Sequence, residues 1–166
     1  MIRILMLNYE FPPLGGGAGN ATYHILKQLA NGEECTIDLV TSSVADFKIE
    51  QFSDNVRVHY LDIGKRGSLH YQSLGNLLTY AWQSYWYARK LQKEESYDIC
   101  HAFFGIPCGF VALLLGTPYV VSLRGSDVPL FSKRFWLLDR LLFWWISRLV
   151  WSRARKVVAV SGHLGA

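Results

Sequence analysis

The feature that most constrains the fold of this chain is the regular alternation of short apolar runs with segments of helical periodicity. The apolar runs have the length of β-strands, and most are nearly continuous, as expected for strands buried on both faces of a sheet. In the segments between them, apolar residues recur three or four positions apart, which favours amphipathic helices. We therefore predict strands at 2–8, 35–43, 56–63, 97–104, 118–125 and 156–161, and helices at 20–32, 71–93, 107–116 and within 133–153.

Strands that alternate with helices form βαβ units with parallel strands and right-handed crossovers. The predicted fold class is therefore α/β: a Rossmann-like, open, mainly parallel sheet with helices on both faces. The 166 residues have the size of one domain, and 51% of them are hydrophobic, which is typical of a globular protein. We expect 1–166 to be a single domain. Because Ser161 resembles the N-cap of a further helix, we also expect the sequence to be part of a longer chain.

The cysteines and the N-terminal segment indicate a cellular compartment. Cys35, Cys100 and Cys108 are odd in number, lie in or beside apolar segments and lack metal-binding spacing. We therefore expect buried free thiols in a reducing environment. The segment MIRILMLNYEF at the N-terminus is too short and wrongly flanked for a signal peptide. The expected localisation is cytoplasmic.

A loop rich in proline and glycine follows the first predicted strand. Pro12, Pro13 and the three glycines Gly15, Gly16 and Gly17 exclude both helix and strand at these positions. Glycines between a strand and a helix let backbone N–H groups approach an anion, and the helix N-terminus adds a favourable dipole. We interpret this segment as a phosphate-binding loop; the alternative is a plain flexible turn.

The loop lacks the known dinucleotide and P-loop patterns. A GxGxxG motif begun at Gly15 has Asn20 in place of the third glycine, and one begun at Gly17 has Thr22 there. The second predicted strand ends in TSS and supplies no carboxylate for a ribose, and no lysine completes a GxxxxGK[ST] motif. These absences argue against a nicotinamide-dependent dehydrogenase and leave backbone amides as the phosphate ligands.

Other candidate residues follow later strands, at the edge where α/β sheets bind ligands. The segment SLRGSDVP (122–129) places Arg124, Ser126 and Asp127 directly after a buried strand. A cation there can bind phosphate and a carboxylate can bind a sugar hydroxyl; a purely structural Arg–Asp pair is the alternative. His101 ends its own strand near the same edge, where it contacts either a ligand or the scaffold.

Together, these features resemble the N-terminal domain of GT-B glycosyltransferases of the large retaining family 4 type. The matching pieces are FPPLGGGAGNA, DICHAF, PYVVSLRGSDVP and ARKVVAVSGHL, which occur in the family's order over nearly the whole chain. The resemblance implies a two-domain enzyme that transfers a sugar from a nucleotide-sugar to an acceptor with retention of configuration. The C-terminal nucleotide-sugar domain is absent from these residues, so we expect this fragment alone to be inactive.

The resemblance also implies roles for individual residues. It implies that Gly16 and Gly17 approach the donor diphosphate across an interdomain cleft. Many relatives have a histidine where this chain has Arg124. Arginine stays protonated at neutral pH, so we assign it charge stabilisation and leave the general base unassigned. No metal or other cofactor is expected. The predicted roles are catalysis for Arg124 and Asp127, donor-phosphate binding for Gly15, Gly16 and Gly17, and acceptor binding for Glu10, Asn20, His101 and Ser126.

The segment from Lys133 to Lys156 is basic and aromatic. It contains seven basic residues and one acid, whereas the whole chain has a net charge of +4, and it holds four of the six tryptophans. Charged residues interrupt its apolar positions, so it is not a transmembrane span. Tryptophan beside arginine suits peripheral contact with the inner face of a membrane and a lipid-linked acceptor. Packing against a neighbouring domain fits the apolar residues equally well.

A second functional hypothesis comes from another class of protein. The same α/β domain can serve as a non-catalytic binding module that docks on a membrane surface or a partner protein through this Trp/Arg-rich helix. In that case the glycine loop would hold an anion without turnover. The excess positive charge is confined to one segment, and no nucleic-acid partner is expected.

Overall fold

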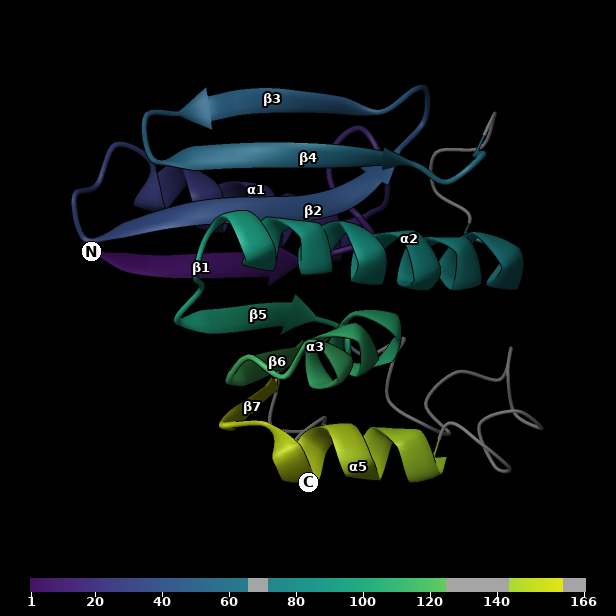
Figure 1. The fold of residues 1–166 in the computed structure, drawn as a ribbon. Coiled ribbons are helices and arrows are strands. Elements are labelled where there is room, and N and C mark those ends of the chain that lie inside the picture. Colours follow the sequence, from purple (N-terminus) through teal and green to yellow (C-terminus); the bar gives the residue numbers. More distant parts are fainter. Residues whose placement is uncertain (66–71, 125–143, 160–166) are drawn as a thin grey trace.

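A seven-stranded sheet in the order β3-β4-β2-β1-β5-β6-β7 forms the centre of the protein (Figure 1). The computed structural model describes residues 1–65, 72–124 and 144–159. Neighbouring strands are parallel except β3, which is antiparallel to β4. The predicted α/β class with a mainly parallel sheet is confirmed. The strands are β1 (Ile2–Leu7), β2 (Cys35–Ser43), β3 (Lys48–Ser53), β4 (Val56–Asp62), β5 (Ile99–Phe103), β6 (Tyr119–Leu123) and β7 (Lys156–Ala159).

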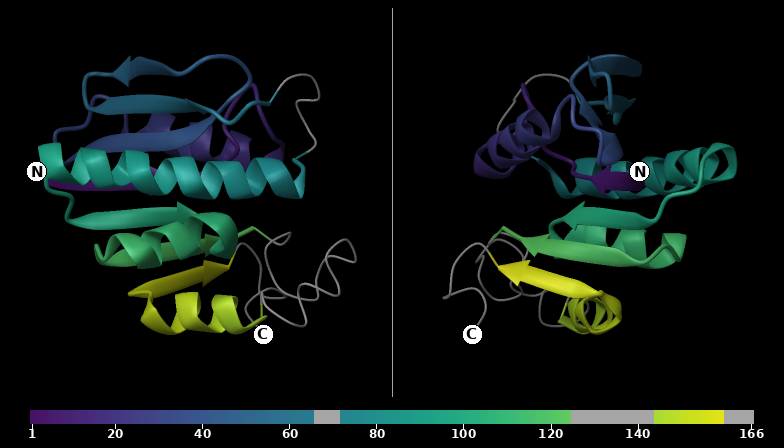
Figure 2. Two further views of the ribbon diagram at one scale, coloured as in Figure 1. Left: turned by 45° about the vertical axis from the view of Figure 1, so that its right-hand side comes forward. Right: turned by 90° about the vertical axis from the view of Figure 1, so that its left-hand side faces the viewer.

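Helices cover both faces of the sheet, as predicted (Figure 2). On one face lies α1 (Gly17–Leu29), and on the other lie α2 (Leu74–Glu94), α3 (Phe110–Leu115) and α5 (Trp144–Arg153). A short π-helical turn, η1 (Gly105–Gly109), leads from β5 into α3. The predicted helices at 20–32, 71–93 and 107–116 therefore correspond to α1, α2 and α3, with shifted starts.

The order of the strands determines where a ligand site can form. From β1 the chain moves outward through β2 to β4, then returns to β5 on the other side of β1 and continues outward through β6 to β7. Leu7 at the end of β1 is aligned with Val40 on one neighbour and Ala102 on the other. The direction of winding reverses between β1 and β5, and open α/β sheets bind ligands outside the carboxyl ends at such a point.

The strand β3 is an addition that the sequence pattern did not predict. Its residues are mostly exposed, and Lys48 Nζ forms an ion pair with Glu50 Oε2 at 2.8 Å. Charged side chains on an edge strand discourage pairing with other chains. The strand has no continuous apolar run, so hydrophobic patterning could not reveal it.

The core confirms the expected state of the cysteines. Cys35, Cys100 and Cys108 are free and buried. Burial raises the pKa of the Cys100 thiol, with a further contribution from Cys108. The Cys100 thiol is therefore protonated at neutral pH, and all three cysteines pack as small apolar groups in the hydrophobic core.

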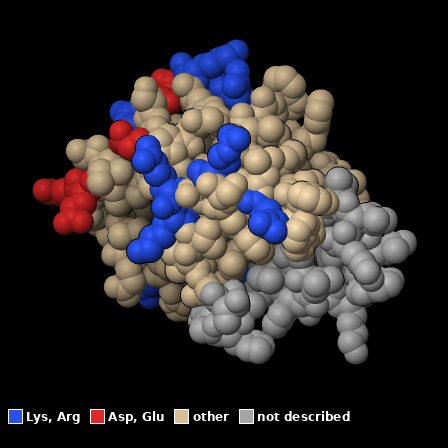
Figure 3. Space-filling view, turned by 90° about the horizontal axis from the view of Figure 1, so that it is seen from below, with Lys and Arg blue, Asp and Glu red and all other residues tan. Residues whose placement is uncertain are grey.

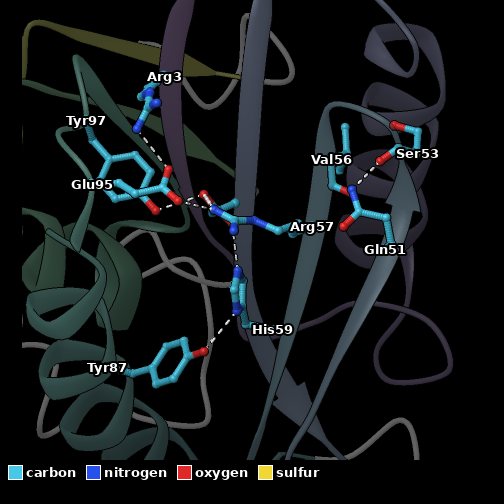
Figure 4. A network of polar contacts seen from close by, with 10 residues as sticks. Arg3, Gln51, Ser53, Val56, Arg57, His59, Tyr87, Glu95 and Tyr97 are labelled. Atoms are coloured by element: carbon cyan, nitrogen blue, oxygen red, sulfur yellow. Dashed lines mark hydrogen bonds and ion pairs between the residues drawn. The ribbon is translucent and has the colours of Figure 1, made fainter.

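A buried polar network lies toward the amino ends of the strands, away from the carboxyl edge (Figure 4). Its centre is Asp38 of β2, which accepts hydrogen bonds from Arg57 Nε at 2.8 Å and from the Tyr97 hydroxyl at 2.8 Å. His59 Nε2 lies 2.7 Å from the same carboxylate. Burial opposes ionisation of Asp38, but the hydrogen bonds from these three partners outweigh it and lower the pKa of Asp38 to about 2.

The network also connects the end of α2 to the sheet. Arg57 Nη2 donates to Glu95 Oε1 at 2.9 Å, and Arg3 Nη1 of β1 donates to Glu95 Oε2 at 2.9 Å. His59 Nδ1 lies 2.9 Å from the hydroxyl of Tyr87 on α2. These contacts hold β1, β4 and α2 together, so the network supports the scaffold.

Candidate functional site

The loop after β1 is fixed at its start by a buried asparagine. Asn8 directly follows the apolar strand, and its Nδ2 donates to Thr22 Oγ1 of α1 at 2.8 Å. Its Oδ1 accepts a hydrogen bond from the Glu10 amide at 3.0 Å, and the Leu14 amide donates to the Phe11 carbonyl at 2.8 Å. The loop therefore has a defined path between the strand and the helix.

Two glycines of the loop are required by the fold itself. Gly15 has φ +88°, and a Cβ atom there would lie 2.6 Å from Glu10 Cβ. At Gly19, a Cβ atom would lie 3.0 Å from the Leu14 carbonyl oxygen. Gly15 therefore excludes larger residues through its conformation and its contact, whereas a side chain at Gly19, in α1, would require the Leu14 backbone to shift.

Gly16 and Gly17 have no such reason to be glycine. A Cβ atom at either position would meet no atom of the described residues within 4 Å. They stand where α1 begins, and the helix has no side-chain cap and no acidic residue in its first turn. The first intrahelical bond runs from the Asn20 amide to the Gly16 carbonyl at 3.1 Å. Amides preceding it in the first helical turn point outward from the helix end, which is the arrangement that binds phosphate.

Glu10, predicted to bind an acceptor, lies against the glycine loop. Its Oε2 accepts a hydrogen bond from the Gly16 amide at 3.4 Å. Burial raises the pKa of Glu10, while the Gly16 amide and the charge of Lys65 oppose this shift. Lys65 is itself buried and donates from Nζ to Gln72 Oε1 at 3.3 Å. No motif in the sequence pointed to Lys65, which brings a cation to the same loop.

A second group of candidate residues lies on β5 and directly after β6. His101 was expected to end its strand, but it is the middle residue of β5 and is aligned with Met6 of β1. His101 Nε2 is 2.8 Å from Ser122 Oγ, and its ring stacks on Phe103 with centroids 4.2 Å apart. The guanidinium carbon of Arg124 lies 5.1 Å from the centroid of the same Phe103 ring. Burial lowers the pKa of His101 to about 4, and the charge of Arg124 contributes. His101 is therefore a neutral imidazole at neutral pH.

The two groups share one edge of the sheet. The Tyr9 ring of the glycine loop packs on Phe104 after β5, with centroids 4.5 Å apart. Neighbouring strands are about 4.8 Å apart, so the ends of β1 and β6 are separated by about 10 Å across β5. The structure thus brings Arg124 and His101 to the same edge as the glycine loop.

The other predicted site residues have different positions. Asn20 is exposed in the first turn of α1, beside the open glycines. Ser126 and Asp127 lie outside the residues that the structure describes. Within the described ranges, no group of three or more His, Cys, Asp or Glu residues is arranged to hold a metal ion.

Comparison with known proteins assigns the chain to a family. Residues 15–166 match the sequence profile of Glycosyltransferase Family 4, which is most of the chain. The chain belongs to glycosyltransferase family 4. This confirms the resemblance to the N-terminal domain of such enzymes that the loop motifs had indicated. No curated protein sequence matches the chain significantly.

Solved structures of other proteins share this fold. The family 4 chain superposes on sucrose-phosphate synthase from Thermosynechococcus elongatus with a TM-score of 0.73 and 14% identity, over 95% of this chain and 42% of that one. MurG from Acinetobacter baumannii gives a TM-score of 0.51 and 13% identity, over 97% and 42% of the respective chains. At these identities the likeness concerns the fold alone. The chain spans less than half of each of these two proteins.

Proposed function

We propose that this chain forms the N-terminal, acceptor-side domain of an enzyme that transfers a sugar from a nucleotide-sugar donor to an acceptor. The observation that carries the proposal is the pair of open glycines, Gly16 and Gly17, at the uncapped start of α1. A Cβ atom at either position would meet open space among the described residues, and a phosphate that approaches the backbone needs this space. The loop also lies where the winding of the sheet reverses, beside β5, which carries His101, and on the side of the sheet where Arg124 follows β6.

In the proposed reaction, the bond between the anomeric carbon of the sugar and the diphosphate oxygen breaks. A bond from that carbon to the acceptor hydroxyl forms, the hydroxyl loses its proton, and a nucleoside diphosphate leaves. Amides at the start of α1 and the cation of Arg124 stabilise the leaving diphosphate. By the family resemblance, the sugar keeps its anomeric configuration. The general base is left unassigned, since Arg124 stays protonated.

Asp127 and the neutral His101 would position the acceptor hydroxyl. The further residues assigned to acceptor binding are Glu10, Asn20 and Ser126. The neutral imidazole of His101 can donate or accept a hydrogen bond, as a positioning group requires. A second domain beyond these residues would supply the nucleotide site, so this domain alone would be inactive. The proposed chemistry assigns charge neutralisation to amides and Arg124 and calls for no metal or other cofactor.

We also propose a peripheral membrane contact through the segment Lys133 to Lys156, which would suit a cytoplasmic enzyme with a sugar or lipid-linked acceptor. In the described part of this segment, Trp145 and Leu149 are exposed on α5. Lysine and arginine side chains gather on this side of the molecule (Figure 3). None of the helices in the described part of the chain has the length and hydropathy of a bilayer-spanning helix.

The test compares glycine substitutions in the enzyme assayed with a panel of nucleotide sugars. Gly17→Val adds a side chain where phosphate would approach, and we expect it to lower kcat/KM for transfer by about 100-fold with the fold intact. The matched control is Gly75→Val in the first turn of α2, where the nearest atom to a Cβ is Ser73 Oγ at 3.7 Å. This control should keep wild-type kcat/KM.

Gly15→Ala serves as a folding control. Because Gly15 has a φ of +88° and lies against Glu10, this substitution should lower the stability of the fold with or without a donor. Wild-type transfer by Gly17→Val would reject the phosphate-binding role of the loop. Absence of transfer with every donor, together with retained anion binding, would instead favour the non-catalytic module.

A further inference from the structure

A line of exposed apolar side chains runs along the outer side of α2. Leu78, Trp82 and Trp86 are four residues apart and therefore lie on one side of the helix. They are 63%, 67% and 55% exposed, and the rings of the two tryptophans lie 5.8 Å apart, centroid to centroid. The helix packs on the protein through a different side, which carries Tyr80, Ser84, Ala88 and Leu91. Contiguous exposed apolar side chains of this size indicate an interaction surface.

The same side of α2 becomes cationic toward the end of the helix. Arg89 and Lys93 continue the line three and seven residues after Trp86, and both are exposed. Lys90 is exposed beside them and lies 3.8 Å from Glu94, a surface ion pair that leaves the cation accessible. The outer side of α2 thus combines an apolar half with a basic half.

A second helix on the same face of the sheet has the same combination. On α5, Trp145 and Leu149 are exposed, and Arg148 is exposed between them. The region 144–159 contains four basic residues and no acid. Both helices, together with α3 between them, cover the face of the sheet opposite α1 (Figure 2). Leu114 on α3 is also exposed.

We infer that the outer surface of α2 and α5 docks on an anionic lipid bilayer. Tryptophan rings settle at the level of the lipid headgroups, and Lys and Arg side chains bind anionic headgroups around them. The mixture of exposed indoles and cations on this face matches that surface in both polarity and charge. The inference extends the contact proposed for α5 to a second helix, and it depends on exposure and charge and not on sugar transfer.

The experiment measures co-sedimentation of the full chain with vesicles of phosphatidylcholine mixed with phosphatidylglycerol, and with phosphatidylcholine alone. We expect binding to the anionic vesicles. Trp82→Ala with Trp86→Ala should lower the partition coefficient by at least about tenfold, because two large apolar side chains no longer enter the interface. Arg89→Gln with Lys93→Gln should lower it by about 25-fold on anionic vesicles, since each cation contributes about fivefold.

Controls use the opposite face of the sheet. Lys27→Gln and Tyr23→Ala alter a cation and an aromatic residue exposed on α1, and they should bind vesicles like the wild type. Trp82→Phe with Trp86→Phe preserves apolar bulk and should retain most of the binding. Near-ultraviolet circular dichroism checks the fold of each variant. Arg89→Gln with Lys93→Gln tests the same surface without removing an apolar side chain.

Three outcomes would overturn the inference. One is equal binding of the wild type and the alanine pair to anionic vesicles. Another is equal binding of the wild type to neutral and anionic vesicles. The third is a dimer that dissociates on Trp82→Ala with Trp86→Ala, which would make a second copy the occupant. Transfer to a water-soluble acceptor is measured in parallel, so a failure of this inference is distinguishable from a failure of the proposed function.

Discussion

At the residue scale, Asp38 shows how strongly a single buried charge can tie this fold together. Its carboxylate is buried and is hydrogen-bonded by residues of β4 and by Tyr97. The pKa of about 2 in the folded protein is lower than the ordinary value of an aspartate. A carboxylate with a lowered pKa stabilises the fold above the unfolded-state pKa, and the contribution is lost as the pH falls toward the folded-state value.

We therefore predict a drop in stability on acidification that depends on Asp38. Between about pH 4 and pH 2, protonation of Asp38 should remove about 2 kcal/mol of unfolding free energy. Asp38→Asn should cost about 3 kcal/mol at neutral pH, because it removes the buried carboxylate that Arg57 and His59 share, and it should flatten this part of the pH profile. Urea unfolding at a series of pH values measures both effects. A profile for Asp38→Asn parallel to that of the wild type would contradict the prediction.

The sequence revealed the residues of the site better than the residues of this network. The glycines and Arg124 were recognised because they follow apolar strands, at the edge where α/β sheets bind ligands, whereas His101 lies within β5. Arg57 and His59 occupy the polar positions of an alternating strand, a pattern that equally suits a solvent-facing side. Their hydrogen bonds to Glu95 and Tyr87 join residues 38 and 28 positions apart in the chain, which no local pattern predicts.

At the scale of the element, patterning located the strands and helices that carry apolar runs. It missed β3, where exposed charged residues hide the alternation, and it placed the starts of α1 and α3 three residues away from their observed positions. Glycine has a low helix propensity, so the sequence pattern does not favour a helix that starts at Gly17. The close contacts at Gly15 and Gly19 fix the backbone here instead. The tertiary contacts of the loop therefore decide this boundary.

The start of α2, in contrast, depends on a local capping box. Ser73 Oγ accepts a hydrogen bond from the Asn76 amide at 3.1 Å, and Asn76 Oδ1 accepts one from the Ser73 amide at 3.2 Å. We predict that Ser73→Ala lowers the unfolding free energy by about 1 kcal/mol. Ser152→Ala is the matched control, since Ser152 Oγ donates to the Leu149 carbonyl within α5 and caps no amide. Equal denaturation midpoints for the two variants would show that the box contributes nothing.

At the scale of the whole molecule, the position of a strand in the sheet should determine how firmly its backbone is held. β1 lies at the centre, pairs with β2 and β5 along its length, and is followed directly by the glycine loop. β3 and β7 end the strand order, and most of their residues are exposed. A rigid central strand is a suitable base for a loop that must hold its amides in fixed directions.

We predict that amide hydrogen exchange follows this order. Amides of β1 and β2 should open only through global unfolding and exchange most slowly, whereas those of β3 and β7 should exchange through local opening and be much faster. Exchange followed by mass spectrometry in native buffer gives the ranking. Low concentrations of urea should accelerate exchange in β1 and β2 and leave the edge strands nearly unchanged, because global opening exposes far more surface than local opening. Equal protection in all strands would contradict this prediction and would mean that the sheet opens as one unit. The central position of β1 would then give the glycine loop no firmer base than an edge strand would.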